Sequence, residues 1–119
     1  GVQTCALPIL AAYNDGEEWL EELKQYLFAN YNYLRVYFEE YLPEFPVATL
    51  EGTYLVWADC SVLNQSSDET VKTLLEKEKL WVNEGSLYGE AGEGFIRINI
   101  ACPRQQLIEG LNRLRRALK

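Results

Sequence analysis

Histidine is absent from this 119-residue chain and basic residues are scarce, because 18 Asp and Glu outnumber 11 Lys and Arg for a formal charge of −7. Without histidine, the chain itself cannot supply a Ser-His-Asp triad, a Cys-His dyad or a His-ligated metal. The acidic balance argues against a nucleic-acid partner, whose phosphates require a basic surface. No apolar run approaches the roughly 18 residues of a membrane span. These absences indicate one small acidic domain that neither binds nucleic acid nor spans a membrane. Its content of 48% hydrophobic residues is enough to form a core.

Cysteine is also sparse, at three residues. Cys60 and Cys102 lie far apart with no C-x-x-C spacing, which excludes a disulfide framework or a zinc site, so no metal is predicted. We expect both to be small buried thiols near strand ends, in a reducing, cytoplasmic compartment.

The first nine residues, GVQTCALPI, are unusual in origin. They are apolar but have no basic region before them, so a signal peptide is not indicated. In order, they match one reading frame of a widely used DNA-sequencing adapter. We therefore expect residues 1–9 to be an adapter-derived artefact, and the natural sequence to begin near Leu10 inside a larger protein.

Helical periodicity is strongest between Asn14 and Leu42, where apolar residues recur every three or four positions. This stripe comprises Trp19, Leu23, Tyr26, Leu27, Tyr31, Leu34, Phe38 and Tyr41. It predicts one long amphipathic helix, with Asn14 and Glu17 spaced as a cap and Pro43 ending it.

Two further helices are predicted. Ser66 and Glu69 have the S-x-x-E spacing of a capping box and begin a short helix that ends near Lys79. Pro103 occupies the first helical position of the last helix, whose leucines form one stripe.

Four strands are predicted from β-branched and aromatic content: 46–49, 53–59, 80–83 and 95–100. We expect Tyr54 and Trp57 to belong to the core. The order is α β β α β β α, which indicates an α/β (α+β) fold, a two-layer sandwich with helices covering one sheet face.

Arg97 stands in the middle of the clearest strand, where isoleucines alternate onto one face and Arg97 falls on the other. If the isoleucines meet the helices, Arg97 lies on the open face. It is then either a solvated surface residue or a guanidinium fork that grips a substrate carboxylate.

The segment 85–94 holds four glycines and is predicted to be a loop. It lacks the G-K-[ST] ending of a phosphate-binding loop and precedes a strand, so nucleotide binding is not indicated. A lid over a neighbouring site and an ordinary surface connection both remain open. The carboxylates Asp59, Glu84, Glu90 and Glu93 show no pairing by spacing, and surface solubility explains them.

Two segments carry a family resemblance: EGTYLVWADC (51–60) and VNEGSLYGEAGEGFIRINIACPR (82–104). They resemble the C-terminal small domain of fold-type I pyridoxal-phosphate enzymes, in the cystathionine β-lyase or cysteine-S-conjugate β-lyase branch of the class I/II aminotransferases. The segment AAYNDGEEWLEELKQYL (11–27) resembles the start of that branch's long helix. The resemblance covers residues 10–119, which are interpreted as this one domain, with the large cofactor-binding domain missing.

The resemblance implies roles for several residues. Arg97 matches the arginine that binds the substrate α-carboxylate. A possible pocket edge is implied for Gly52, Thr53, Tyr54, Gly85 and Ser86. Glu84 stands where the family usually has proline, which implies a less rigid loop. None of the chain's lysines lies in the family's Schiff-base context, so no catalytic residue is expected here, and pyridoxal 5′-phosphate is expected to be bound mainly by the missing domain.

The implied activity belongs to the full-length parent: cleavage of cysteine S-conjugates into a thiol, pyruvate and ammonia by a homodimer acting on a small amino-acid substrate. The chain alone is expected to be inactive, to fold marginally and to expose an apolar patch where the large domain packs. Two alternatives remain open, a class I/II aminotransferase and a free-standing, non-catalytic binding module.

Overall fold

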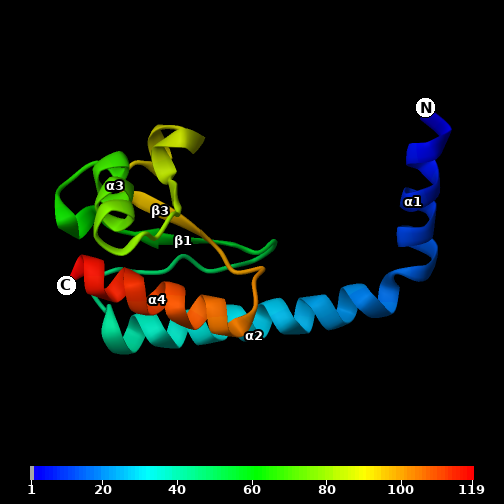
Figure 1. Ribbon diagram of the computed structural model, residues 1–119, viewed down its shortest axis with the longest axis horizontal. Coiled ribbons are helices and arrows are strands. Elements are labelled where there is room, and N and C mark those ends of the chain that lie inside the picture. Colours follow the sequence, from blue (N-terminus) through cyan, green and yellow to red (C-terminus); the bar gives the residue numbers. More distant parts are fainter. Residues whose placement is uncertain (1) are drawn as a thin grey trace.

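The structure is a computed structural model that describes residues 2–119, with side-chain exposure from residue 6 onward. Figure 1 shows a sheet above two helices and a helical arm that extends away from them. The α-helices are α1 (Val2–Asp15), α2 (Glu17–Tyr41), α3 (Ser67–Glu78) and α4 (Arg104–Leu118). No helix in this described range is both long enough and apolar enough to cross a membrane.

The sheet is antiparallel with the strand order β1-β3-β2. Its strands are β1 (Leu55–Asp59), β2 (Asn83–Glu84) and β3 (Phe95–Asn99). The central strand is therefore β3, and Arg97 at its midpoint pairs with Trp57 on one side and Asn83 on the other. This register places the arginine where all three strands meet.

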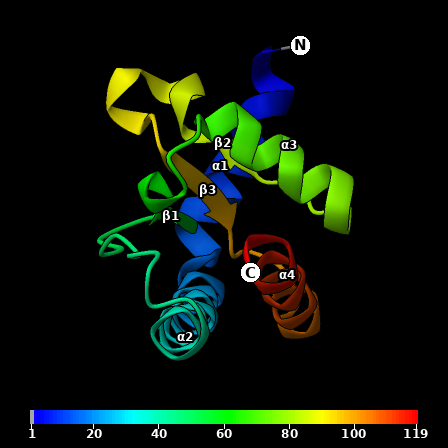
Figure 2. The same cartoon turned by 90° about the vertical axis from the view of Figure 1, so that its left-hand side faces the viewer.

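The isoleucine face of β3 meets the helices, as the alternation predicts. Ile96 and Ile100 are completely buried and Ile98 nearly so. Figure 2 shows α2 and α4 side by side against this face, with α3 beside α4 near the β2 edge. Burying a leucine or isoleucine side chain contributes about 1.5–3 kcal/mol, so this layer is the main source of stability. The leucine stripe of α4 joins it through Leu107, Leu111 and Leu114. The predicted two-layer fold class is confirmed.

The capping box of α3 is confirmed. Ser66 Oγ accepts a hydrogen bond from the Glu69 N–H at 3.2 Å, and Glu69 Oε2 accepts from the Ser66 N–H at 3.0 Å. The helix ends at Glu78, and its C-cap residue Lys79 adopts a left-handed conformation with φ 54°. The α4 prediction is shifted by one residue, because Pro103 is the N-cap and Arg104 begins the helix.

Two predicted strands differ from the structure. The segment 46–49 forms only an isolated bridge between Val47 and Ala58, because Pro46 has no N–H to continue a ladder. The strand predicted over residues 80–83 is wrong except at Asn83, where β2 begins. The left-handed conformation of Lys79 directs residues 80–82 away from β3. The other two strands form over Leu55–Asp59 and Phe95–Asn99.

The predicted long helix is confirmed as α2, which ends before Pro43, but the predicted cap at Asn14 is wrong because α1 continues through Asp15. The chain bends at Gly16, which separates α1 from α2, and no side-chain cap forms there. A Cβ at Gly16 would lie 2.4 Å from the Ala12 carbonyl oxygen, so only glycine fits this close approach.

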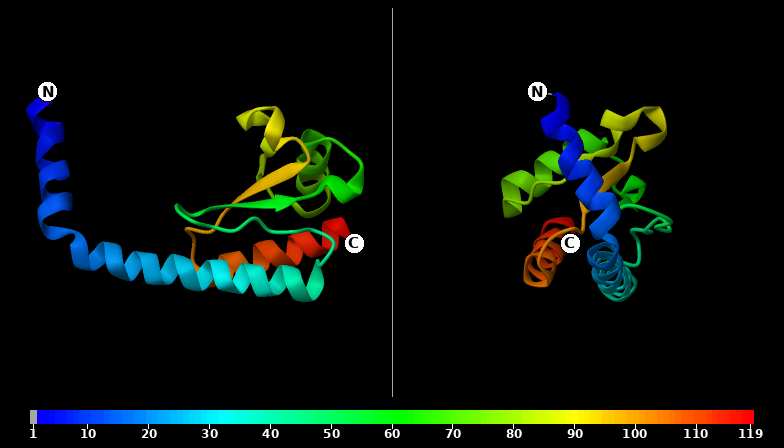
Figure 3. Two further views of the ribbon diagram at one scale, coloured as in Figure 1. Left: turned by 180° about the vertical axis from the view of Figure 1, so that it is seen from behind. Right: turned by 90° about the vertical axis from the view of Figure 1, so that its right-hand side faces the viewer.

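The second half of α2 packs on the domain, and its buried residues begin at Asn30. In the first half, Trp19 is 64% exposed despite belonging to the predicted stripe, and Tyr26 is 43% exposed although its hydroxyl donates to the Cys102 carbonyl at 3.0 Å. Figure 3 shows α1 and the first half of α2 projecting beyond the sheet. We call residues 10–29, which follow the segment expected to be adapter-derived, the helical arm.

Candidate functional site

Arg97 is half-buried on the open face of the sheet. Its Nη2 donates to Asn83 Oδ1 at 3.3 Å, and its guanidinium carbon lies 4.1 Å from the centre of the Tyr88 ring. Its Nε is buried and has no hydrogen-bond partner within residues 2–119. A guanidinium has five N–H donors, so most of its capacity for binding an anion is uncommitted.

Aromatic rings surround this arginine on the open face. The Trp57 ring meets the Tyr88 ring edge-on, with centroids 5.5 Å apart, and Trp57 also contacts Phe95 at 6.5 Å. Trp57 therefore lies on the face opposite the core, and Tyr54 is 43% exposed, so their prediction as core residues was wrong. The period-2 alternation of β1 buries Val56 and Ala58 instead.

The glycine-rich segment folds into two short 3₁₀ turns, Gly85–Tyr88 and Glu90–Gly92. Glu93 Oε1 accepts a hydrogen bond from the Ser67 N–H at 2.7 Å, and Ser67 Oγ accepts from the Gly94 N–H at 2.8 Å. The hydrogen bond from Ser67 is the main cause that lowers the pKa of Glu93. The segment is thus tied to the start of α3, and Glu93 has a structural function that surface solubility did not anticipate.

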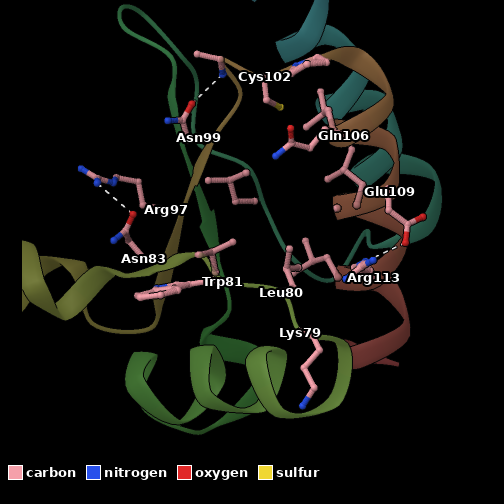
Figure 4. Close-up of a pocket in the computed structure, with 18 residues that line it drawn as sticks. Lys79, Leu80, Trp81, Asn83, Arg97, Asn99, Cys102, Gln106, Glu109 and Arg113 are labelled. Carbon is pink, nitrogen blue, oxygen red and sulfur yellow. Dashed lines mark hydrogen bonds and ion pairs between the residues drawn. The ribbon is translucent and has the colours of Figure 1, made fainter.

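A groove of about 680 Å³ opens beside Arg97, between residues 79–83, the end of β3 and the start of α4. Figure 4 shows Arg97 and Asn83 at one end and the Glu109–Arg113 ion pair at the other. Apolar side chains such as Ile98, Leu80 and Leu107 line it, with polar groups among them. The guanidinium of Arg97 points toward Asn83 and away from the apolar lining in Figure 4, so its free N–H groups face the open side of the sheet and not this groove.

The predicted pocket-edge residues do not gather around Arg97. Gly52, Thr53 and Tyr54 precede β1 and lie near the end of β3, where the Ile100 N–H donates to the Tyr54 carbonyl at 3.0 Å. Gly85 and Ser86 lie near the beginning of β3, since a Cβ at Gly85 would be 2.7 Å from the Phe95 carbonyl oxygen. The two groups flank Arg97 from opposite ends of the strand.

Asn83 and Tyr88 contact Arg97 directly, and neither was singled out from the sequence. The register of β2 against β3 places Asn83 beside Arg97, and a two-residue strand is too short to reveal a register by pattern. Tyr88 is the aromatic residue of the loop motif. The motif therefore pointed to this position but did not indicate that its ring contacts Arg97.

The chain matches the sequence profile of the aminotransferase class I and II family over residues 1–114. The chain belongs to this family. It is 37% identical over 110 residues to protein MalY of Escherichia coli and 36% identical to the cystathionine β-lyase PatB of Bacillus subtilis. Each alignment covers 92% of this chain and 28% of the relative, so the chain spans little more than a quarter of their length.

A solved structure of the family supports the fold. The pyridoxal-phosphate-bound C–S lyase of Staphylococcus hominis superposes with a TM-score of 0.83 at 34% identity, covering 91% of this chain and 29% of that one. The chain therefore has the fold of the corresponding part of that enzyme.

The residues described here do not form a pyridoxal-phosphate site by themselves. All five lysines, Lys24, Lys72, Lys77, Lys79 and Lys119, are exposed. Lys79 borders the groove, but its Nζ donates to the Glu76 carbonyl at 3.2 Å and points away from Arg97 (Figure 4).

Proposed function

We propose that the whole protein is a pyridoxal-phosphate-dependent C–S β-lyase of the cystathionine β-lyase type, which converts cysteine S-conjugates into a thiol, pyruvate and ammonia. Residues 10–119 are its C-terminal small domain, and residues 1–9 are adapter-derived. The names of PatB and of the Staphylococcus hominis C–S lyase support the reaction class. The chain covers only 28% of its curated relatives, which supports a larger parent over a free-standing binding module.

The observation that carries this proposal is the uncommitted guanidinium of Arg97. A planar guanidinium binds a carboxylate through two parallel hydrogen bonds, a geometry that lysine cannot provide. Held in the middle of a sheet, Arg97 fixes the α-carboxylate of an amino acid and so orients the substrate's remaining bonds. Orientation of this kind accounts for a large part of enzymatic rate enhancement.

The remaining chemistry belongs to the rest of the parent. Bound there, pyridoxal phosphate supplies the electron sink for loss of the α-proton and the β-thiolate. The lysine that carries the cofactor and the groups that bind its phosphate lie in the large domain. We further propose a homodimer in the cytoplasm, with Gly52, Thr53, Tyr54, Gly85 and Ser86 at the edges of the pocket.

The proposal is tested by replacing Arg97 in the full-length protein. We expect Arg97→Ala to reduce kcat/KM for an S-substituted cysteine about 100-fold, because charge-assisted hydrogen bonds to the carboxylate are lost. Arg97→Lys should recover only part of this loss, because a single ammonium cannot form the bidentate pair. Arg35→Ala, which removes an exposed ion pair with Glu39, is the matched control and should retain activity. Unchanged kcat/KM in Arg97→Ala would refute the proposal.

The family name favours a second candidate, an aminotransferase. Both activities require the same carboxylate grip, so Arg97 does not distinguish them. Incubating the full-length protein with an S-substituted cysteine separates them by product. Pyruvate and free thiol without an added keto acid indicate the lyase, whereas turnover that depends on an added keto acid indicates the aminotransferase.

A further inference from the structure

Tyr88 contacts both Arg97 and Trp57. The guanidinium carbon lies over the ring at 4.1 Å from its centre, and the Trp57 ring, on β1, meets the Tyr88 ring in a T-shaped contact at 5.5 Å. Trp57 is the cross-strand neighbour of Arg97. The Tyr88 ring and the Arg97 guanidinium are therefore both positioned by contacts with β1 and β3. The stack therefore joins the turn Gly85–Tyr88 to the open face of the sheet.

The loop that carries Tyr88 is itself fastened down. Gly85 and Gly92 approach so closely that a Cβ on either would lie within 2.2 Å of the other's carbonyl oxygen, at 2.0 and 2.2 Å. The Ser67 and Glu93 hydrogen bonds then tie the end of the loop to α3. These contacts set the position of the turn Gly85–Tyr88, although Tyr88 is 48% exposed.

Arg97 needs such support because its other anchor is weak. A single Nη2–Asn83 hydrogen bond of 3.3 Å leaves the side chain free to rotate about that contact, and Nε contributes none. An arginine side chain has many rotamers, which must be restricted before a bidentate pair can form. A ring stacked on the guanidinium plane restricts them without occupying the N–H groups.

We propose that Tyr88 is a positioning residue for substrate: its ring holds the guanidinium of Arg97 in the plane that receives the substrate carboxylate. The inference rests on the proposed function of Arg97. It assigns to the glycine-rich loop the task of presenting this ring, in place of either the lid or the plain surface connection. Because Tyr88 acts through Arg97, its removal affects the affinity for carboxylate substrates more than it affects turnover.

The first test measures KM and kcat of the full-length protein. We expect Tyr88→Leu to raise KM for an S-substituted cysteine about three- to fivefold, the size of one cation–π contact, and to leave kcat within about twofold. Tyr88→Phe keeps the ring and should retain the wild-type KM. Tyr41→Leu is the matched control, since it removes a comparable stack on Arg115, 4.5 Å from the ring centre, on the helical face.

The second test reports the stack directly. Ring currents shift the protons of a stacked guanidinium upfield, so the Arg97 Nε–H signal should move downfield in Tyr88→Leu and stay in place in Tyr88→Phe. Pentafluorophenylalanine at position 88 keeps the shape of the ring but reverses its quadrupole, and should raise KM as Tyr88→Leu does. This variant separates stacking from any loss of folding.

The outcomes distinguish the two proposals. If Arg97→Ala leaves kcat/KM unchanged, the proposed function fails. If Arg97→Ala is impaired while Tyr88→Leu has wild-type KM and an unmoved Arg97 signal, the role of Tyr88 fails and that of Arg97 stands. A Tyr88→Phe variant as impaired as Tyr88→Leu would also overturn the inference, because the hydroxyl and not the ring would then be required.

Discussion

Cys60 shows how position alone determines the chemistry of a residue. It follows β1 and is only 1% exposed. Burial, with a smaller contribution from Asp59, raises the pKa of its thiol from 9.0 to about 12. Cys102 is half-buried, and burial raises the pKa of its thiol as well. The prediction of small buried thiols near strand ends is thus confirmed for Cys60 and approximately so for Cys102.

We predict that Cys60 resists alkylation at pH 10. At this pH an ordinary thiol of pKa 9.0 is ionised and reactive, whereas a thiol of pKa about 12 remains protonated. A raised pKa also means that the unfolded chain releases this proton first, so stability falls as pH rises between these two values. In a Cys5→Ser background, iodoacetamide labelling followed by mass spectrometry should modify Cys102 before Cys60. Equal labelling rates in the folded protein would contradict the prediction.

The connection between the glycine-rich loop and α3 gives a prediction at the scale of elements. The pKa of Glu93 is lowered from 4.5, first by the hydrogen bond from the Ser67 N–H. A lowered pKa stabilises the fold above the ordinary value, and this contribution is lost as pH falls through the lowered pKa. We therefore expect Glu93→Gln to lower Tm at pH 7 and the difference from wild type to disappear in acid below the lowered pKa.

The control for this prediction is Glu90→Gln, in the same loop, because Glu90 is exposed and accepts no side-chain hydrogen bond from residues in the described range. It should leave Tm unchanged at both pH values. Thermal unfolding followed by circular dichroism measures both variants. A Tm difference for Glu93→Gln that is as large in acid as at pH 7 would show that charge at Glu93 is not the cause.

The sequence correctly predicted those helices and strands that depend on interactions between residues close together in the chain. The Ser66–Glu69 capping box and the isoleucine alternation of β3 depend on spacings of two or three residues, and both are present. The bend at Gly16 depends on a contact with Ala12 that no periodicity encodes. Arg97 was placed on the open face by alternation, but Asn83 and Tyr88 reach it only through a two-residue strand pairing and a folded loop.

At the scale of the whole molecule, the helical arm is the part that packs least on the domain. Beyond the adapter-derived residues it exposes the large apolar residues Leu10, Tyr13, Trp19, Leu20 and Phe28, and the molecule measures 50 × 30 × 25 Å. So many large exposed apolar side chains on one segment are unusual in a soluble protein. The apolar patch expected from the sequence is present, and its burial against the large domain of the parent remains a prediction.

We predict that this arm causes self-association of the isolated chain and not of the full-length protein. Exchanging its apolar residues for acidic ones, as in a Trp19→Glu, Phe28→Glu double variant, should shift the isolated chain toward monomer in analytical ultracentrifugation and reduce the fluorescence of bound anilinonaphthalene sulfonate. Trp81→Glu is the matched control, because Trp81 is 80% exposed but stands apart from the arm on the segment before β2. It should change neither measurement. In the full-length protein the same double variant should lower Tm, because it places two charges in the proposed domain interface. A full-length variant with unchanged Tm would show that the arm faces solvent in the parent, and the assignment of its partner would have to be withdrawn.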